Sequence, residues 1–125
     1  MTLQLTIILM LLGHLVADYT LQGCLADLKC KSWWEKTAKA ELGKELSCTK
    51  YKHDYIAGLL CHSLYWSILV CLPFYSHPVL WIAILVNTVI HAVVDDLKAN
   101  RLSINLITDQ IIHLLQIAGT ALCLA

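Results

Sequence analysis

Several features that identify common classes of small protein are scarce or missing in this chain. Its six cysteines form no Cys-x-x-Cys motif, and three of them lie inside apolar segments. The sequence therefore indicates neither a disulfide framework nor a zinc site built from sulfur ligands. No basic residue precedes the first apolar segment, and no small-residue cleavage motif follows it, so we expect no removable signal peptide.

Charged residues are also scarce. They make up 14% of the 125 residues, the formal net charge is zero, and acidic residues are interspersed among the lysines. This pattern disfavours binding to nucleic acid.

Apolar residues dominate instead. They account for 58% of the chain, and the mean hydropathy is +0.67, which is more than a small soluble domain needs. Four stretches are long enough to cross the hydrocarbon core of a bilayer. We predict an all-α membrane protein, a single domain over residues 1–125 in which four transmembrane helices form an up-and-down bundle. The predicted helices cover residues 2–21, 55–74, 78–98 and 104–125.

Basic residues are confined to two of the connections between these segments. Lys98 and Arg101 lie between the third and fourth segments, whereas the turn at 73–78 and both chain ends carry none. By the positive-inside rule, both basic loops face the cytoplasm and both termini face outward. The basic residues between the first and second segments are Lys29, Lys31, Lys36, Lys39, Lys44, Lys50 and Lys52.

The long first loop, residues 22–54, carries a second helical signal. Ser32 and Glu35 fit a capping box, and apolar residues recur at helical spacing after them, which predicts an amphipathic helix over residues 32–47. This helix either lies in the cytoplasmic headgroup layer or packs as a soluble helix on the end of the bundle. The loop is also where we expect a membrane or cytoplasmic protein partner to bind.

Four histidines stand one to each apolar segment, and three of them have an aspartate four residues away. Residues four apart share one face of a helix, so each pair presents an imidazole and a carboxylate together. Odd helices end and even helices begin on the cytoplasmic side, which places all these groups near one leaflet. The pairs are His14 with Asp18, His91 with Asp95 and His113 with Asp109, and the fourth histidine is His62.

These seven groups exceed the three or four protein ligands that a zinc ion normally takes. Either two metal ions share the site, or some groups orient the ligands, or one carboxylate is left free as a general base. Zinc is favoured, and iron or manganese also suits imidazole and carboxylate ligands. A purely structural hydrogen-bond network is the alternative without metal. The predicted metal ligands are His14, Asp18, His62, His91, Asp95 and His113.

The remaining polar residues receive roles around this site. Asp109 is predicted to be the general base or an additional ligand, and Lys98 either holds a phosphate or neutralises Asp95. Asp96 is expected to pair with Arg101. Glutamines at Gln22, Gln110 and Gln116 are expected to orient ligands or to bond across helices. Gly13 and Gly58 are expected to permit close helix packing, and His53 and His77 to be surface residues.

Four ordered motifs resemble the bacterial and phage membrane-protein family known as domain of unknown function 3307. They are GHLVADYTLQ from Gly13 to Gln22, the His62 helix, HAVVDDLK from His91 to Lys98, and DQIIH from Asp109 to His113. The resemblance implies a bacterial cytoplasmic (inner) membrane protein, but no assigned activity. It implies functional roles for His14, Asp18, Gln22, His62, His91, Asp95, Lys98, Asp109, Gln110 and His113. The loop from Asp27 to Lys52 is not part of the family pattern.

Three functions fit this sequence. The first is a metal-dependent hydrolase that activates water near the inner leaflet and acts on membrane lipid or another phosphodiester substrate. The second is an ion- or proton-conducting bundle completed by homo-oligomerisation. The third is a membrane interaction protein whose bundle is fastened by a structural metal or a hydrogen-bond network.

Overall fold

Helices form all the regular structure in residues 2–124, the part of the chain that the computed structural model describes. This confirms the all-α prediction. The long helices are α1 (Leu3–Leu15), α4 (Asp54–Cys71), α5 (Leu80–Ala99) and α6 (Leu106–Leu124). The π-helical turn η1 (Val16–Thr20) extends α1, and the 3₁₀ turn η3 (Leu72–Phe74) extends α4. The first connection contains α2 (Leu25–Leu28), α3 (Lys31–Leu42) and the 3₁₀ turn η2 (Leu46–Cys48).

Four helices are long and apolar enough to cross a membrane, and they lie close to the predicted ranges. Two of them start at side-chain caps: Thr2 Oγ1 accepts a hydrogen bond from the Leu5 amide, and Asn105 Oδ1 accepts one from the Thr108 amide. Such caps satisfy amide groups that have no partner within the helix. The spans are Leu3–Thr20, Asp54–Phe74, Leu80–Ala99 and Leu106–Leu124.

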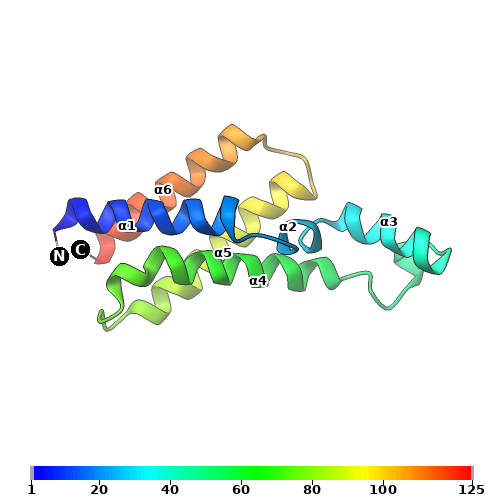
Figure 1. Cartoon of the computed structure of the whole chain (residues 1–125), viewed down its shortest axis with the longest axis horizontal. Coiled ribbons are helices and arrows are strands. Elements are labelled where there is room, and N and C mark those ends of the chain that lie inside the picture. The colour runs from blue at the N-terminus through cyan, green and yellow to red at the C-terminus, as the bar shows by residue number, and fades with distance from the viewer. Residues whose placement is uncertain (1, 125) are drawn as a thin grey trace.

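The four spans form a closed bundle in which each helix packs against two neighbours. Helix α1 packs against α4 and α6, and α5 packs against the same two helices. Leucine, isoleucine and valine side chains remain exposed on the outer faces of all four helices, as expected for surfaces that meet lipid. The start of α1, the end of α6 and the α4–α5 connection lie at one end of the bundle, and the other two connections lie at the opposite end (Figure 1).

The interior changes character along the bundle axis. At the end that contains the two termini, the core is apolar and includes Met10, Val70, Phe74, Ile117 and Ala121. The buried histidines, aspartates and lysine of residues 2–124 all lie toward the opposite end. These groups are therefore gathered in one half of the bundle.

Two glycines permit backbone contacts beside this polar half. A Cβ atom on Gly13 would lie 2.8 Å from the Leu69 carbonyl oxygen, and one on Gly58 would lie 2.6 Å from the Leu28 carbonyl oxygen. No real Cβ contact is this short, so only glycine fits at either position. The prediction that Gly13 and Gly58 permit close packing is confirmed, and Gly58 brings α2 directly onto α4.

The amphipathic helix of the first loop begins one residue earlier and ends sooner than predicted. Helix α3 starts at Lys31 and ends at Leu42, where Gly43 adopts a left-handed conformation with φ of 59°. The predicted Ser32 capping box is wrong, because the residue that precedes the helix is Cys30 and its side chain makes no cap bond. The cap comes from another helix: Asn100 Oδ1 accepts a hydrogen bond of 2.7 Å from the Lys31 amide.

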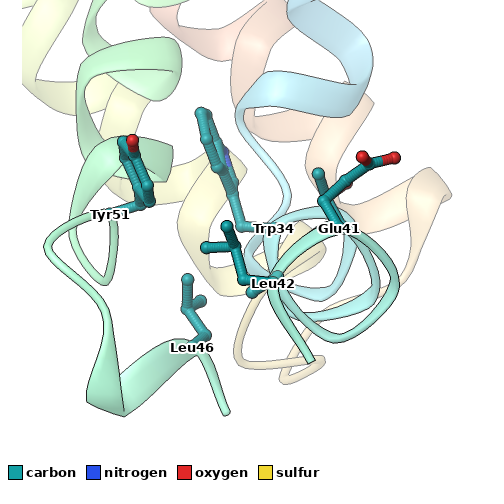
Figure 2. Close-up of a pocket in the computed structure, with 7 residues that line it drawn as sticks. Trp34, Glu41, Leu42, Leu46 and Tyr51 are labelled. Atoms are coloured by element: carbon teal, nitrogen blue, oxygen red, sulfur yellow. The ribbon is translucent and has the colours of Figure 1, made fainter. Parts of the chain in front are cut away.

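Helix α3 lies beyond the bundle end, roughly along its long axis (Figure 1). Its apolar face meets the loop that follows it and encloses a pocket of about 260 Å³ with that loop. Trp34 from α3 and Tyr51 from the loop project into this space above Leu42 and Leu46 (Figure 2). Ala38 and Leu46 are buried there. The apolar stripe of α3 is therefore covered in part by its own loop.

Candidate metal centre

The polar half of the bundle brings together all seven predicted imidazole and carboxylate groups. Helix α1 with η1 contributes two of them, α4 one, α5 two and α6 two. Each of the four histidines is at most 3% exposed, and Asp95 and Asp109 are at most 1% exposed. Burial of so many ionisable groups is costly unless they are paired or bind an ion.

One group of three donor atoms has the spacing of metal ligands. His62 Nε2 lies 3.2 Å from His91 Nε2, and Asp18 Oδ1 lies 3.4 Å from the first and 3.8 Å from the second. Ligands about 2.05 Å from a tetrahedral zinc ion are about 3.3 Å apart. Asp18, His62 and His91 could therefore hold a metal ion after small shifts.

Unpartnered polar atoms support this assignment. In residues 2–124, seven buried side-chain nitrogen or oxygen atoms have no hydrogen-bond partner, and six of them belong to this cluster. One is Asp18 Oδ1, a member of the group above. Buried polar atoms are nearly always bonded, and such exceptions often mark the position of an ion or a water molecule.

A second group uses His91 again. His91, Asp95 and His113 also lie close enough to hold an ion. Asp95 Oδ1 is 3.6 Å from His113 Nε2, and Asp95 Oδ2 is 3.8 Å from His91 Nε2. The Nε2 atom of His91 has one lone pair in the neutral ring, so it can bind an ion in only one of the two groups at a time. The geometry thus favours one ion over two.

His14 belongs to neither group. Its Nδ1 accepts a hydrogen bond of 2.9 Å from the Trp66 indole, and its Nε2 bonds to Gln110 Oε1 at 3.1 Å. Both ring nitrogens are therefore occupied by protein groups. The structure gives His14 the position of a hydrogen-bonded neighbour of the ligands.

Asp109 is held by a lysine and a glutamine. Lys98 Nζ donates to Asp109 Oδ2 at 2.7 Å, and Gln110 Nε2 donates to the same oxygen at 2.9 Å. The other oxygen, Oδ1, lies 3.3 Å from His113 Nε2. Lys98 is also 3.5 Å from Asp95 Oδ1, so its single positive charge lies next to both carboxylates.

The two other predicted glutamines lie at different depths. Gln22 Nε2 is 3.4 Å from His62 Nε2 and so borders the cluster. Gln116 lies two helical turns beyond Asp109 and donates from Nε2 to the carbonyl oxygen and side chain of Asn87, each at 2.8 Å. It bridges α5 and α6 away from the predicted ligands. Asp96 pairs with Arg101 at 2.8 Å, as predicted.

Two residues of the site escaped the sequence analysis. Lys29, counted there among the loop lysines, is 5% exposed and donates to Asp95 Oδ2 at 2.6 Å. Trp66 is fully buried, and its ring stacks on His91 with 4.3 Å between centroids. A lysine in a basic loop and a tryptophan in an apolar segment both look ordinary in sequence, so neither carried a signal.

The backbone is irregular where Asp18 enters the site. The Leu21 amide donates to the carbonyl oxygen of Val16, five residues earlier, which closes the π-helical turn η1. Turns of this kind are rare and concentrate at functional sites. In this turn Asp18 keeps Oδ2 3.4 Å from His14 Nδ1 and presents Oδ1 to His62.

Comparisons with known proteins find no relative. No family model matches the chain, and neither the curated proteins nor the solved structures contain a match. The resemblance to the domain of unknown function 3307 family therefore stays a prediction from its motifs.

Proposed function

We propose that this protein binds one divalent metal ion through Asp18, His62 and His91 and uses it to hydrolyse an amphipathic substrate in one leaflet of the membrane. The observation that carries the proposal is the triangle of donor atoms, with sides of 3.2, 3.4 and 3.8 Å, built from three separate helices. Three protein ligands with a fourth position open are typical of catalytic zinc sites. Zinc is favoured, and iron or manganese would suit the same donors.

Two residues next to the proposed ligands, Asp109 and His113, could accept a proton from a metal-bound water molecule. A bound divalent ion would polarise a water molecule at its open position. Asp109 and His113 form a carboxylate–imidazole pair with 3.3 Å between Oδ1 and Nε2, and the His113 ring stacks on His91 with 4.1 Å between centroids. A pair of this kind next to the ligands is suited to accept a proton from the water. The role of base predicted for Asp109 is thus shared with His113.

The depth of the centre suggests the class of substrate. The ligands lie toward the end of the bundle that carries the basic connections: Asp18 is close to the end of its span at Thr20, and His62 and His91 are each about two helical turns inside theirs. Lys98 is the ammonium group of the centre that is partly accessible, with a quarter of its side chain exposed. A phosphodiester at the headgroup level of a lipid fits both the depth and this charge.

Conduction of ions or protons through a single bundle is disfavoured by the other half of the interior. Among the described residues, that half buries no charged or histidine side chain. Its buried hydroxyl groups, such as those of Ser67 and Thr88, donate to backbone carbonyls of their own helices. Within residues 2–124, no chain of ionisable side chains crosses this half.

A fastening network without metal is the second candidate, and the ion pairs favour it. Lys29 with Asp95 and Lys98 with Asp109 compensate two of the three carboxylates at 2.6 and 2.7 Å. The third carboxylate, that of Asp18, leaves one negative charge. Either a divalent ion or a protonated histidine can balance it. The metal centre would place a divalent ion next to Asp18, whereas the network without metal would place a protonated histidine there.

Turnover of lipid tests the hydrolase. The purified protein, loaded with zinc, is incubated with vesicles of bacterial lipid extract, and released phosphomonoesters are followed by phosphorus NMR. We expect release by the wild type, and none after treatment with a chelator or in Asp109→Asn. Gln116→Ala, which changes the amide away from the ligands, should release product at the wild-type rate. A metal-loaded wild type that cleaves no phosphodiester in the extract would contradict the hydrolase.

A further inference from the structure

Asp18 and Asp95 are placed almost symmetrically about the pair of histidines. Asp18 Oδ1 lies 3.4 Å from His62 Nε2 and 3.8 Å from His91 Nε2. Asp95 Oδ2 lies at the same two distances from the same two atoms. By distance alone, both carboxylates qualify as ligands of one ion. They differ in their lysine partners: Asp95 Oδ2 accepts a hydrogen bond from Lys29 and Asp95 Oδ1 lies 3.5 Å from Lys98, whereas Asp18 Oδ1 has no partner.

Lys29 is fixed in this position by its own segment of chain. Asn100 Nδ2 donates to the Lys29 carbonyl oxygen at 3.1 Å, and Asn100 Oδ1 accepts from the Lys31 amide at 2.7 Å. On the other side, the Trp34 indole donates to the Leu28 carbonyl oxygen at 2.9 Å. Gly58 lets the same residue approach α4. These bonds fix the backbone on both sides of Lys29, and its ammonium group is thereby positioned next to Asp95.

We propose that Lys29 is a positioning residue of the metal centre, which withholds Asp95 from the metal ion and keeps the fourth coordination position open. The proposal rests on the metal site of Asp18, His62 and His91. An ammonium group 2.6 Å from an oxygen competes with a metal ion for its electrons, and the two cations repel each other. A metal ion therefore binds the free carboxylate of Asp18.

Lys29 thereby decides which class of site the bundle contains. With Asp95 withheld, the ion has three protein ligands, as in catalytic sites. With Asp95 released, two imidazoles and two carboxylates would surround it, and the site would be closed like a structural one. The lysine lies on the first connection, whereas every ligand lies on a membrane span. The first connection thus contributes the positively charged group that controls access of Asp95 to the metal ion.

Cobalt binding and azide binding test this role together. Co²⁺ replaces the native ion, its visible spectrum gives the dissociation constant, and azide shifts that spectrum only where it can enter the coordination sphere. We expect the wild type to bind one Co²⁺ and to respond to azide. In Lys29→Met, we expect Co²⁺ to bind about tenfold tighter or more and the response to azide to be lost, because Asp95 fills the open position.

Two single variants serve as controls. Lys29→Arg retains the positive charge and should behave as the wild type. Lys31→Met removes an exposed lysine whose nearest carboxylate is Glu35 at 3.8 Å, and it should also leave both readouts unchanged. A response to azide that persists in Lys29→Met, with unchanged affinity for Co²⁺, overturns the proposal and leaves the metal site intact. A wild type that binds no Co²⁺ overturns the metal site and this proposal with it.

The double variant K29M/D95N covers the case in which Lys29→Met does not fold. It removes both charges of the buried pair, which is tolerated better than the removal of one. Because the fourth carboxylate is then absent, we expect the double variant to bind Co²⁺ and to respond to azide. A double variant that binds Co²⁺ without a response to azide would show that Lys29 acts only on the fold and not through Asp95.

Discussion

At the scale of single residues, Trp66 contacts two of the histidines, although tryptophan side chains do not bind metal ions. Its indole N–H donates to His14, and its ring stacks on His91 at a centroid distance of 4.3 Å. The first interaction fixes the tautomer of His14, so that its Nε2 carries the proton that bonds to Gln110. Gln110 in turn bonds to Asp109. The indole thus lies at one end of a hydrogen-bonded chain that ends at the carboxylate.

Trp66→Phe separates these two interactions. Phenylalanine keeps an aromatic ring beside His91 but leaves His14 Nδ1 buried without a donor. We expect the free energy of unfolding to fall by about 1–3 kcal/mol, measured by thermal unfolding in detergent. Metal content should stay at the wild-type level, because His14 lies outside the ligand group. Loss of the metal would show that the Trp66 indole supports the ligand group and would contradict this separation.

Substitution of Asp18 and of Asp109 by asparagine should affect the metal content of the protein differently. Asp18→Asn removes the charged ligand, so we expect the bound metal to fall below about a tenth of the wild-type amount, because even the loss of a group that only orients a ligand lowers metal affinity about 10- to 100-fold. Asp109→Asn changes a group outside the ligand triangle and should retain the metal. Elemental analysis of both purified variants measures the contrast. Equal metal content in the two variants contradicts the assignment of the ligands.

Spacing in the sequence was enough to find most of this site, because an aspartate four residues from a histidine shares its helix face. His91 with Asp95 and His113 with Asp109 are within 3.8 and 3.3 Å in the structure. Lys29 could not be found in this way, since its contact with Asp95 joins residues 66 positions apart. The hydrogen bonds of His14 also needed coordinates, because they join it to Trp66 and Gln110 on other helices.

At the scale of elements, the length and hydropathy of the apolar segments were sufficient to predict all four spans. The first connection was harder, because its structure depends on other helices. Helix α3 begins where Asn100, at the end of α5, accepts a hydrogen bond from its first amide. The helix therefore starts at Lys31, where Asn100 caps it, and not after Ser32 as the local sequence predicted. The π-helical turn at Asp18 likewise has no signature in the residue pattern.

Glycine substitutions test the close contacts between elements. Gly58→Ala would place its Cβ 2.6 Å from the Leu28 backbone, so we expect a loss of about 1–3 kcal/mol in the free energy of unfolding. Gly119→Ala is the matched control in α6, because a Cβ there meets nothing within 4 Å. It should be neutral or should stabilise by up to about 1 kcal/mol. Thermal unfolding of the two variants side by side gives the comparison, and equal melting temperatures would contradict the packing of α2 on α4.

At the scale of the whole molecule, the bundle has one polar end and one apolar end, and the positive-inside rule gives it a direction. The basic connections adjoin the polar end, so we predict that the candidate centre faces the cytoplasmic leaflet. The apolar end, with both termini, then faces outward. Within the bundle, ion pairs are buried and the outer faces of the helices are apolar, as expected for a surface that meets lipid.

Labelling of native cysteines tests this orientation. Cys24 and Cys48 are exposed on the first connection, so a maleimide that cannot cross membranes should modify them in inside-out vesicles and not in right-side-out vesicles. Cys30 should react more slowly, because burial raises the pKa of its thiol and leaves less thiolate at neutral pH. Mass spectrometry of the peptides distinguishes the sites. Labelling of Cys24 and Cys48 only in right-side-out vesicles would reverse the predicted topology.

Metal stoichiometry decides between an ion-binding centre and a network of ion pairs. Elemental analysis of purified, extensively dialysed protein should find one divalent ion per chain in the wild type. It should find almost none in His62→Ala, which removes a ligand. His77→Ala is the control, because His77 lies in the α4–α5 connection and its Nδ1 accepts only from the Val79 amide. It should retain the ion. A wild type without stoichiometric metal, or equal metal in His62→Ala and the wild type, would contradict the centre proposed at Asp18, His62 and His91.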